Sequence, residues 1–449
     1  MIIANLRSKF LGGSAAVALG AAALLAGSAV VFTALEAPAA AQTRIDRDRD
    51  RDRERNRDRG QQAADSNYSE GFVNAFRPAV ELQNATPRDG AAMRALVPSI
   101  AGAISTPDDR LAGGQFIYSA GVETQDQAMQ LQGLNLMLES GKVAPANLGQ
   151  INFVAGQLAF QAEDWQRARQ YLTAAAQAGY TENDPTLLIV ETHLKQGDTA
   201  GGLAHLSSAV DQQLAAGQTP SEDLLRKGLA TAYTGQINTE ALKYAQMFAR
   251  YYPAADSWGD AIVVTRAATQ LTDDDTLDLL RLQRRTNTFR DGQEYLAYVE
   301  FADPRRLPNE VRKVIEEGYA SGLLDRGNSF ASEALSTAQG RQAQVTADLA
   351  GLERDARAGD ARLATVLAAG NVLMDAGQPQ KAEEFYRKAA TMPGADTATA
   401  LTRLGIAQVE QGKYAEAAAT FEQVQGARSA VPQLWAIYAR QQGGTATGG

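Results

Sequence analysis

Histidine, aspartate and glutamate are the residues with which this chain could bind a metal ion, because it has two histidines and no cysteine. Both histidines, His193 and His205, fall in one segment, with Glu191 and Asp198 as the nearest carboxylates. No spacing in that segment matches a metal motif, so we interpret both histidines as packing or surface residues. The lack of cysteine excludes thiol catalysis, disulfides and cysteine-ligated zinc or iron–sulfur sites.

A second candidate for metal chemistry is the acidic run TDDDTLD, residues 272–278. It lacks the loop glycine and the distal glutamate of an EF-hand, so calcium binding is not predicted. Carboxylates at the start of a helix complement the helix dipole, and we interpret the run in that way. Motifs for nucleophilic serine, Walker or dinucleotide chemistry are also missing. The sequence therefore predicts no enzyme and no catalytic, cofactor-binding or metal-binding residue.

The N-terminus has the three parts of a secretory signal. Arg7 and Lys9 are followed by an apolar stretch from Phe10 to Leu35 and then by the small residues Ala39 and Ala41. We expect residues 1–41 to be a signal peptide that is cleaved after Ala41.

The length of the apolar stretch leaves one alternative open. It approaches the roughly 20 residues that span a bilayer, so the segment could stay as an inner-membrane anchor. Both alternatives export everything from Arg44 onward. We therefore expect the protein in the periplasm or at the cell surface of a Gram-negative bacterium, with membrane contact only if the segment is uncleaved.

The run from Arg44 to Arg59 alternates opposite charges, with eight arginines against five aspartates and one glutamate. Most arginines have a neighbouring carboxylate, and the whole chain has a formal net charge of −9, so nucleic acid is not an expected partner. The run has almost no apolar residue with which to offset the entropy of ordering. We interpret residues 42–65 as a disordered Arg/Asp-rich linker; a specific role for its arginines stays open.

Two segments near the C-terminus repeat each other without a gap, residues 363–393 and residues 398–428. Their matching residues are each 35 apart: Gly370 and Gly405, Gly377 and Gly412, Ala382 and Ala417, Tyr386 and Phe421. The first glycine of each segment would allow a close helix approach, and the second would end the helix in the left-handed conformation. The alanine and the ring share one face of a second helix. Each segment is therefore predicted to be a helical hairpin that must stack on neighbours.

These landmarks resemble the tetratricopeptide-repeat (TPR) family, whose motif is a 34-residue helix-turn-helix. Similar patterns occur at residues 151–180, 185–210 and 224–253, where the spacing from Gly235 to Ala241 suggests a turn one residue longer. Weaker units are expected at 258–285, 295–319 and 72–141. The sequence around Phe116 could pass for a strand, but we interpret it as helix. The resemblance predicts an all-α fold, an α-solenoid of TPR-like helix-turn-helix repeats behind a disordered N-terminal linker.

The expected organisation follows from these boundaries. After the signal and linker we expect an N-terminal and central TPR-like solenoid at 66–320 and an irregular helical connector at 321–359, which could be a long helix pair or a seam between two arrays. A C-terminal TPR pair at 360–440 and a flexible tail at 441–449 complete the chain.

The resemblance also implies where a partner would bind, because repeats of this family present the first helix of each hairpin to a concave groove. On that basis we expect a protein or peptide partner at eight first-helix positions: Phe153, Gln157, Phe160, Asn371, Met374, Thr402, Ile406 and Val409. The basic and asparagine pairs with which some members hold a C-terminal carboxylate are missing from these helices.

The function that these patterns favour is a non-enzymatic periplasmic or cell-surface scaffold that binds protein or peptide partners. Two alternatives remain open. One is a structural, self-assembling or membrane-tethered envelope component, and the other is an atypical envelope hydrolase. The sequence predicts neither the identity of the partner nor the oligomeric state.

Overall fold

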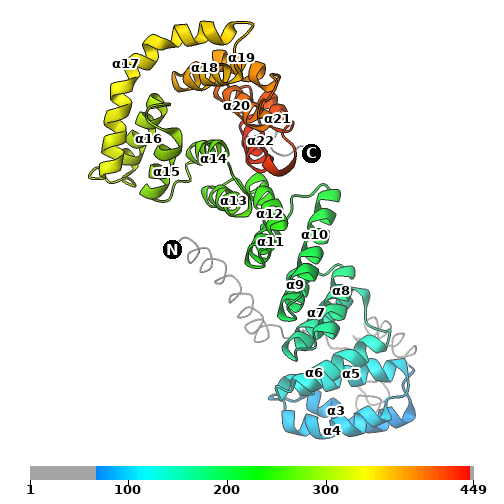
Figure 1. The fold of residues 1–449 in the computed structure, drawn as a ribbon. Helices are drawn as coiled ribbons and strands as arrows, with labels where there is room; N and C mark the ends of the chain where they lie inside the picture. The colour runs from blue at the N-terminus through cyan, green and yellow to red at the C-terminus, as the bar shows by residue number, and fades with distance from the viewer. Residues whose placement is uncertain (1–66, 445–449) are drawn as a thin grey trace, which may run out of the picture. The chain divides into compact units, whose positions relative to one another are not determined.

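The computed structural model describes residues 67–444, and the regular elements in that range are helices, with no strand (Figure 1). Successive helices pack as TPR-like hairpins, which confirms the predicted all-α solenoid class. Phe116 lies in a helix, as we interpreted it. The predicted signal or anchor, the linker at 42–65 and the tail beyond residue 444 lie outside the described residues.

The chain divides into two compact units, residues 1–209 and 210–449. This boundary falls inside the segment that we expected to be one solenoid at 66–320. In unit 1 the helices are α3 (Glu70–Asn84), α4 (Gly90–Ala103), α5 (Pro107–Glu123), α6 (Gln127–Glu139), α7 (Pro145–Gln161), α8 (Trp165–Gln177) and α9 (Pro185–Lys195), and α10 (Thr199–Ala215) runs across the boundary. In unit 2 they are α11 (Glu222–Thr234), α12 (Asn238–Tyr251), α13 (Ala255–Ala268), α14 (Asp273–Arg285), α15 (Gly292–Ala302), α16 (Pro308–Ser321), α17 (Ser329–Arg357), α18 (Leu363–Asp375), α19 (Pro379–Ala390), α20 (Thr397–Glu410), α21 (Tyr414–Phe421), the short 3₁₀ helix η2 (Gly426–Arg428) and α22 (Ala430–Gln442).

The regular hairpins share a three-residue turn whose middle residue is left-handed. Gly377 has φ of 71° and Gly412 has φ of 73°, as their positions predicted. The turn allows the Gln378 N–H to bond the Leu373 carbonyl at 2.8 Å, which satisfies a carbonyl at the end of the first helix. Glycine adopts this conformation without the steric cost that a Cβ brings.

The hairpin α11/α12 corrects our expectation of a longer turn. Gly235 is right-handed, with φ of −76°, and the left-handed residue is Gln236, with φ of 56°. The Ile237 N–H bonds the Ala232 carbonyl at 2.9 Å, so the turn has the same length as at Gly377. The prediction failed because we assigned the turn to the nearest glycine, whereas the left-handed position is held by a glutamine.

The other glycine of each repeat allows close helix packing, as predicted. A Cβ added to Gly370 would lie 2.7 Å from the ring of Tyr386, and one added to Gly405 would overlap the ring of Phe421. Gly228 meets Tyr244 in the same way. In each case the side chain 16 residues further on fills the space that the missing Cβ leaves. The 16-residue spacing between the close-packing glycine and the ring is therefore also present in α11/α12, where the left-handed turn residue is not a glycine.

The segment expected as an irregular connector is largely one continuous helix, α17, of 29 residues. Its buried side chains are Ala331, Ala334 and Ala338 near the start and Ala356 near the end. The first three pack with α14–α16, and Ala356 packs with the C-terminal repeats. The helix therefore connects two cores of unit 2 and has no buried residue along its middle.

The last helix of unit 2 packs back on the central helices rather than extending the array. α22 contacts α12, α13 and α14 as well as α21 (Figure 1). Trp435, which is fully buried, donates its indole N–H to the Asp278 carbonyl at 2.9 Å. As a result, α22 covers part of α14.

Candidate functional site

The acidic run at the start of α14 caps the helix and also binds the C-terminal repeats. Thr272 and Asp275 form a capping box, so our interpretation of the run as a helix start is confirmed. Asp275 additionally receives two hydrogen bonds from Arg428, at 3.0 Å to Nε and 2.5 Å to Nη2. A planar guanidinium matches a carboxylate in this bidentate manner, which makes the contact directional.

Arg403 of α20 makes the second contact with this run. Its side chain is 4% exposed, and its Nη2 lies 2.6 Å from Asp274 while its Nε lies 3.7 Å from the buried Asp278. Burial raises the pKa of the Asp278 carboxyl, although the charges of Arg403 and Arg281 oppose that shift. Asp278 therefore needs its arginine neighbours in order to stay ionised inside the fold.

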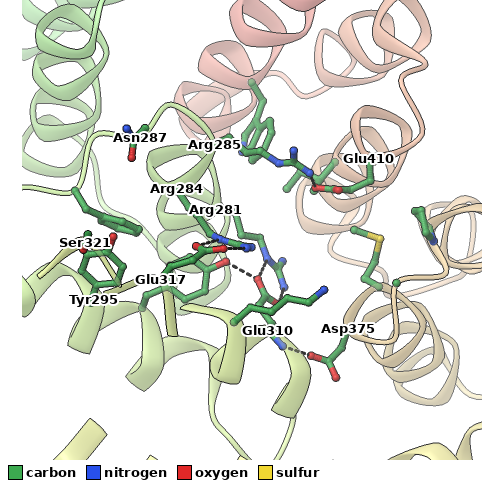
Figure 2. A pocket seen from close by; sticks show the side chains of 18 of the residues that line it. Arg281, Arg284, Arg285, Asn287, Tyr295, Glu310, Glu317, Ser321, Asp375 and Glu410 are labelled. Atoms are coloured by element: carbon green, nitrogen blue, oxygen red, sulfur yellow. Dashed lines mark hydrogen bonds and ion pairs between the residues drawn. The ribbon is translucent and has the colours of Figure 1, made fainter. Parts of the chain in front are cut away.

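Arg281 holds α14 against α16. Its Nε and Nη2 donate to the two carboxylate oxygens of Glu310 at 2.7 and 2.8 Å, and the Tyr298 hydroxyl donates to the same group at 2.5 Å (Figure 2). Burial opposes the ionisation of Glu310, but the charge and hydrogen bonds of Arg281 prevail and lower its pKa to about 2. One turn further on, Arg284 pairs with Glu317 at 2.7 and 2.5 Å.

Asp375, at the end of α18, caps the N-terminus of α16. Its carboxylate accepts the backbone N–H of Asn309 at 3.2 Å and that of Glu310 at 2.7 Å, and the Asn309 side chain donates at 2.9 Å. A carboxylate satisfies the free N–H groups and complements the dipole at a helix start. The first C-terminal repeat is thereby fixed to α16.

A pocket of about 800 Å³ lies where these helices meet, and we call it the central pocket (Figure 2). Its basic and acidic side chains largely pair with one another, as in Arg285 with Glu410. Lys313 is exposed and has no ion-pair partner among the described residues. Arg281, Arg284, Arg285, Asn287, Phe289, Tyr295, Tyr298, Glu310, Lys313, Glu317, Ala320, Ser321, Met374, Asp375, Gly377, Pro379, Ile406, Glu410 and Trp435 line the pocket.

Two of the predicted partner-binding residues, Met374 and Ile406, line the central pocket. Asn371 lies apart from it and accepts hydrogen bonds from Tyr386 at 2.9 Å and from Arg403 at 3.3 Å. Thr402 and Val409 are buried, and the Thr402 hydroxyl bonds back to its own helix. A role for these five residues in partner binding stays a prediction.

The three predicted residues of α7 lie in unit 1. Phe153 is buried and stacks on Tyr180 with ring centroids 4.8 Å apart. Gln157 is also buried, and half-buried Phe160 meets Trp165 edge-on. Their contacts are within unit 1, and partner binding at these positions likewise stays a prediction.

Sequence reasoning missed the arginines that bind the acidic run. Arg403 and Arg428 lie 129 and 153 residues from the aspartates that they contact. The one available signal was that Arg403 is a charged residue on the otherwise uncharged stretch of α20 from residue 397 to 409. Such a position indicates a buried partner but does not identify it.

The histidines contribute no metal site to the described residues. His193 Nδ1 lies 2.8 Å from Asp198, and burial lowers the pKa of His205. No cluster of three or more metal-binding side chains occurs between residues 67 and 444. In the same range, no helix is long and apolar enough to cross a membrane.

Residues 362–429 match the model of a tetratricopeptide repeat family, and no curated protein matches the chain. A similar solved structure is described as Naa15/Naa10 bound to HypK-THB. Its sequence is 13% identical to this chain and the TM-score is 0.27. The similarity covers 84% of this chain and 67% of the chain in that structure. The matched range contains the hairpins α18/α19 and α20/α21. The chain thus carries tetratricopeptide repeats at 362–429, in a repeat fold that typically serves as a scaffold for protein–protein interaction rather than for catalysis.

Proposed function

We propose that this protein is an exported scaffold of the bacterial cell envelope that binds a partner protein or peptide in the central pocket. The observation that carries the proposal is the pocket itself, because both tetratricopeptide repeats contribute first-helix residues to it. Its volume of about 800 Å³ is within the range of sites that enclose a ligand. Export is supported by the layout of the N-terminal 41 residues.

The chemistry of the pocket favours a polypeptide over a simple anion. Arg281, Arg284 and Arg285 already pair with carboxylates of the chain, so they offer little free positive charge. Tyr295 and Met374 provide apolar and polarizable surface, and Lys313 provides one unpaired cation. A segment that buries an apolar side chain near Met374 and places an acceptor near Lys313 would match these groups.

Site-specific crosslinking tests the binding site. A photo-activated crosslinking residue at position 313 should capture one defined envelope protein, and Met374→Glu should abolish that capture. The matched control places the same residue at Lys195, an exposed lysine of unit 1. Equal adducts from both positions, or capture that survives Met374→Glu, would rule out the central pocket.

Export is tested separately by fractionation and N-terminal sequencing of the mature protein. A periplasmic protein that begins at Gln42 supports a cleaved signal. A membrane-bound protein that begins at Met1 supports the anchor, and a cytoplasmic protein contradicts the proposed location.

A further inference from the structure

A second cleft of about 470 Å³ lies alongside the middle of α17, and we call it the α17 groove. Its walls come from α17, α18 and the turn before α16, with one residue each from α14 and α20, so a helix outside the repeats forms one side. The lining residues are Asp274, Arg305, Arg306, Leu307, Arg341, Val345, Asp348, Leu349, Leu352, Ala364, Leu367, Ala368, Asn371, Val372 and Arg403. The α17 groove and the central pocket have no lining residue in common.

The floor of the α17 groove is apolar. Val345, Leu349 and Leu352 lie on one face of α17, because they are four and three residues apart. All three are only half-buried, and Leu367 and Val372 face the same cleft from α18. No side chain of α17 between residues 339 and 355 is fully buried, although both ends of the helix are packed. Leu349 and Leu352 pack against the core of the C-terminal repeats but stay half-buried, so the middle of α17 keeps part of its apolar surface, a stripe along one face, open to the groove.

The rim of the α17 groove is positively charged. Arg305, Arg306 and Arg341 are exposed, and none of them forms an ion pair with a described residue. Arg403 and Asp274 pair with each other, while Asp348 receives hydrogen bonds from Gln344. Four arginines against two aspartates leave the lining with a net charge of +2, in a chain whose formal net charge is −9. Unpaired guanidinium groups beside leucine side chains would complement a partner segment that has carboxylates next to apolar residues.

We propose that the α17 groove binds an acidic amphipathic segment of a partner protein. Apolar side chains of that segment pack on the stripe of α17, and its carboxylates pair with the arginines of the rim. A helix laid into the groove would present its apolar residues at the same three- and four-residue spacing as the stripe. The apolar floor distinguishes this site from one for nucleic acid or a free phosphate, which need cations without a leucine surface.

Binding of a synthetic peptide to the purified full chain tests the proposal. The probe is a fluorescent helical peptide of about 16 residues, with leucine at i, i+4 and i+7 and glutamate elsewhere. Two matched peptides replace either the glutamates by lysine or the leucines by serine. Anisotropy should show binding of the Leu/Glu peptide that weakens with salt and is lost with either replacement.

Variants locate the bound peptide on the chain. Arg305→Glu/Arg306→Glu should weaken binding by about tenfold or more, because two ion pairs become repulsive contacts. The matched control, Arg77→Glu/Lys195→Glu, changes the net charge equally at exposed cations of unit 1 and should bind normally. Hydrogen exchange should slow in residues 339–355 of α17 when the peptide is present.

The proposal is overturned if the arginine and control variants bind alike, if the serine peptide binds as tightly as the leucine peptide, or if exchange in α17 is unchanged. Met374→Glu should leave peptide binding intact, since Met374 lines the central pocket and not the α17 groove. A failure of the α17 groove is thus distinguishable from a failure of the proposed function.

Discussion

The interior of the C-terminal repeats and their contact with α14 are held by different forces. Inside the repeats, Gly370 and Gly405 receive the rings of Tyr386 and Phe421, which lie 16 residues further on. Against α14, the repeats use Arg403 and Arg428, whose carboxylate partners are more than a hundred residues away. Apolar packing therefore forms each hairpin, and buried ion pairs select the surface on which the hairpins sit. Directional charge contacts suit that second role, because a misplaced carboxylate would be buried without a partner.

The largest expected effect comes from removing the buried Arg403, because the buried Asp278 carboxylate would then have only Arg281, at 2.7 Å, to balance its charge among the described residues. Arg403→Met should lower the free energy of unfolding by about 3–5 kcal/mol, measured by urea denaturation. Adding Asp278→Asn should recover a large part of this loss, since the buried charge is then gone. If the double variant is no more stable than the single one, ion pairing does not govern this contact.

Acid should weaken the contact between α14 and α16 through Glu310. Its pKa falls to about 2 in the fold, against an ordinary value of 4.5. A lowered pKa contributes stability that is fully present above about pH 4.5 and is lost as the pH falls toward 2, amounting to up to about 3 kcal/mol. The stability difference between the native chain and Glu310→Gln should therefore shrink from pH 7 to about pH 3. A difference that is constant over this range would contradict the assignment.

Inside the repeats, the glycine contact should be sensitive to any added side chain. Gly405→Val would place methyl groups against the buried ring of Phe421 and should cost about 2 kcal/mol. Gly340→Val is the matched control, because Gly340 is also in a helix but has no atom within 4 Å of an added Cβ. Thermal unfolding should separate the two variants by several degrees, and equal melting temperatures would show that close packing at Gly405 is not required.

The smallest expected effect concerns the turn of α11/α12. Gln236→Gly removes a Cβ from a left-handed residue with φ of 56° and should stabilise unit 2 by about 0.5–1 kcal/mol. The reverse change, Gly377→Gln, should destabilise by a similar amount, since Gly377 has φ of 71°. If Gln236→Gly and Gly377→Gln shifted the denaturation midpoint in the same direction, the two turns would not be equivalent.

The repeat architecture could be predicted because its signals are local. Gly370, Gly377 and Tyr386 each act on residues within one hairpin, so their spacing alone indicates two helices, a turn and a close contact. In α11/α12 the left-handed residue is Gln236 and not the neighbouring Gly235, so the rule that the glycine marks the left-handed turn residue failed there. The candidate site was predicted only in part: Met374 and Ile406 line the central pocket, whereas its charged pairs were not foreseen.

The sequence by itself determined that this is a helical-repeat protein, that its C-terminal hairpins have the tetratricopeptide pattern and that cysteine chemistry is excluded. Periodicity and turn residues suffice for this, since they act over a few residues. Only the tertiary structure decided that α22 returns to α14, that Arg403 and Arg428 bind the acidic run, and that half-buried apolar side chains of α17 line a cleft beside three arginines without an ion-pair partner among the described residues. Those contacts join residues far apart in the chain, and neither composition nor spacing specifies which distant charges will meet.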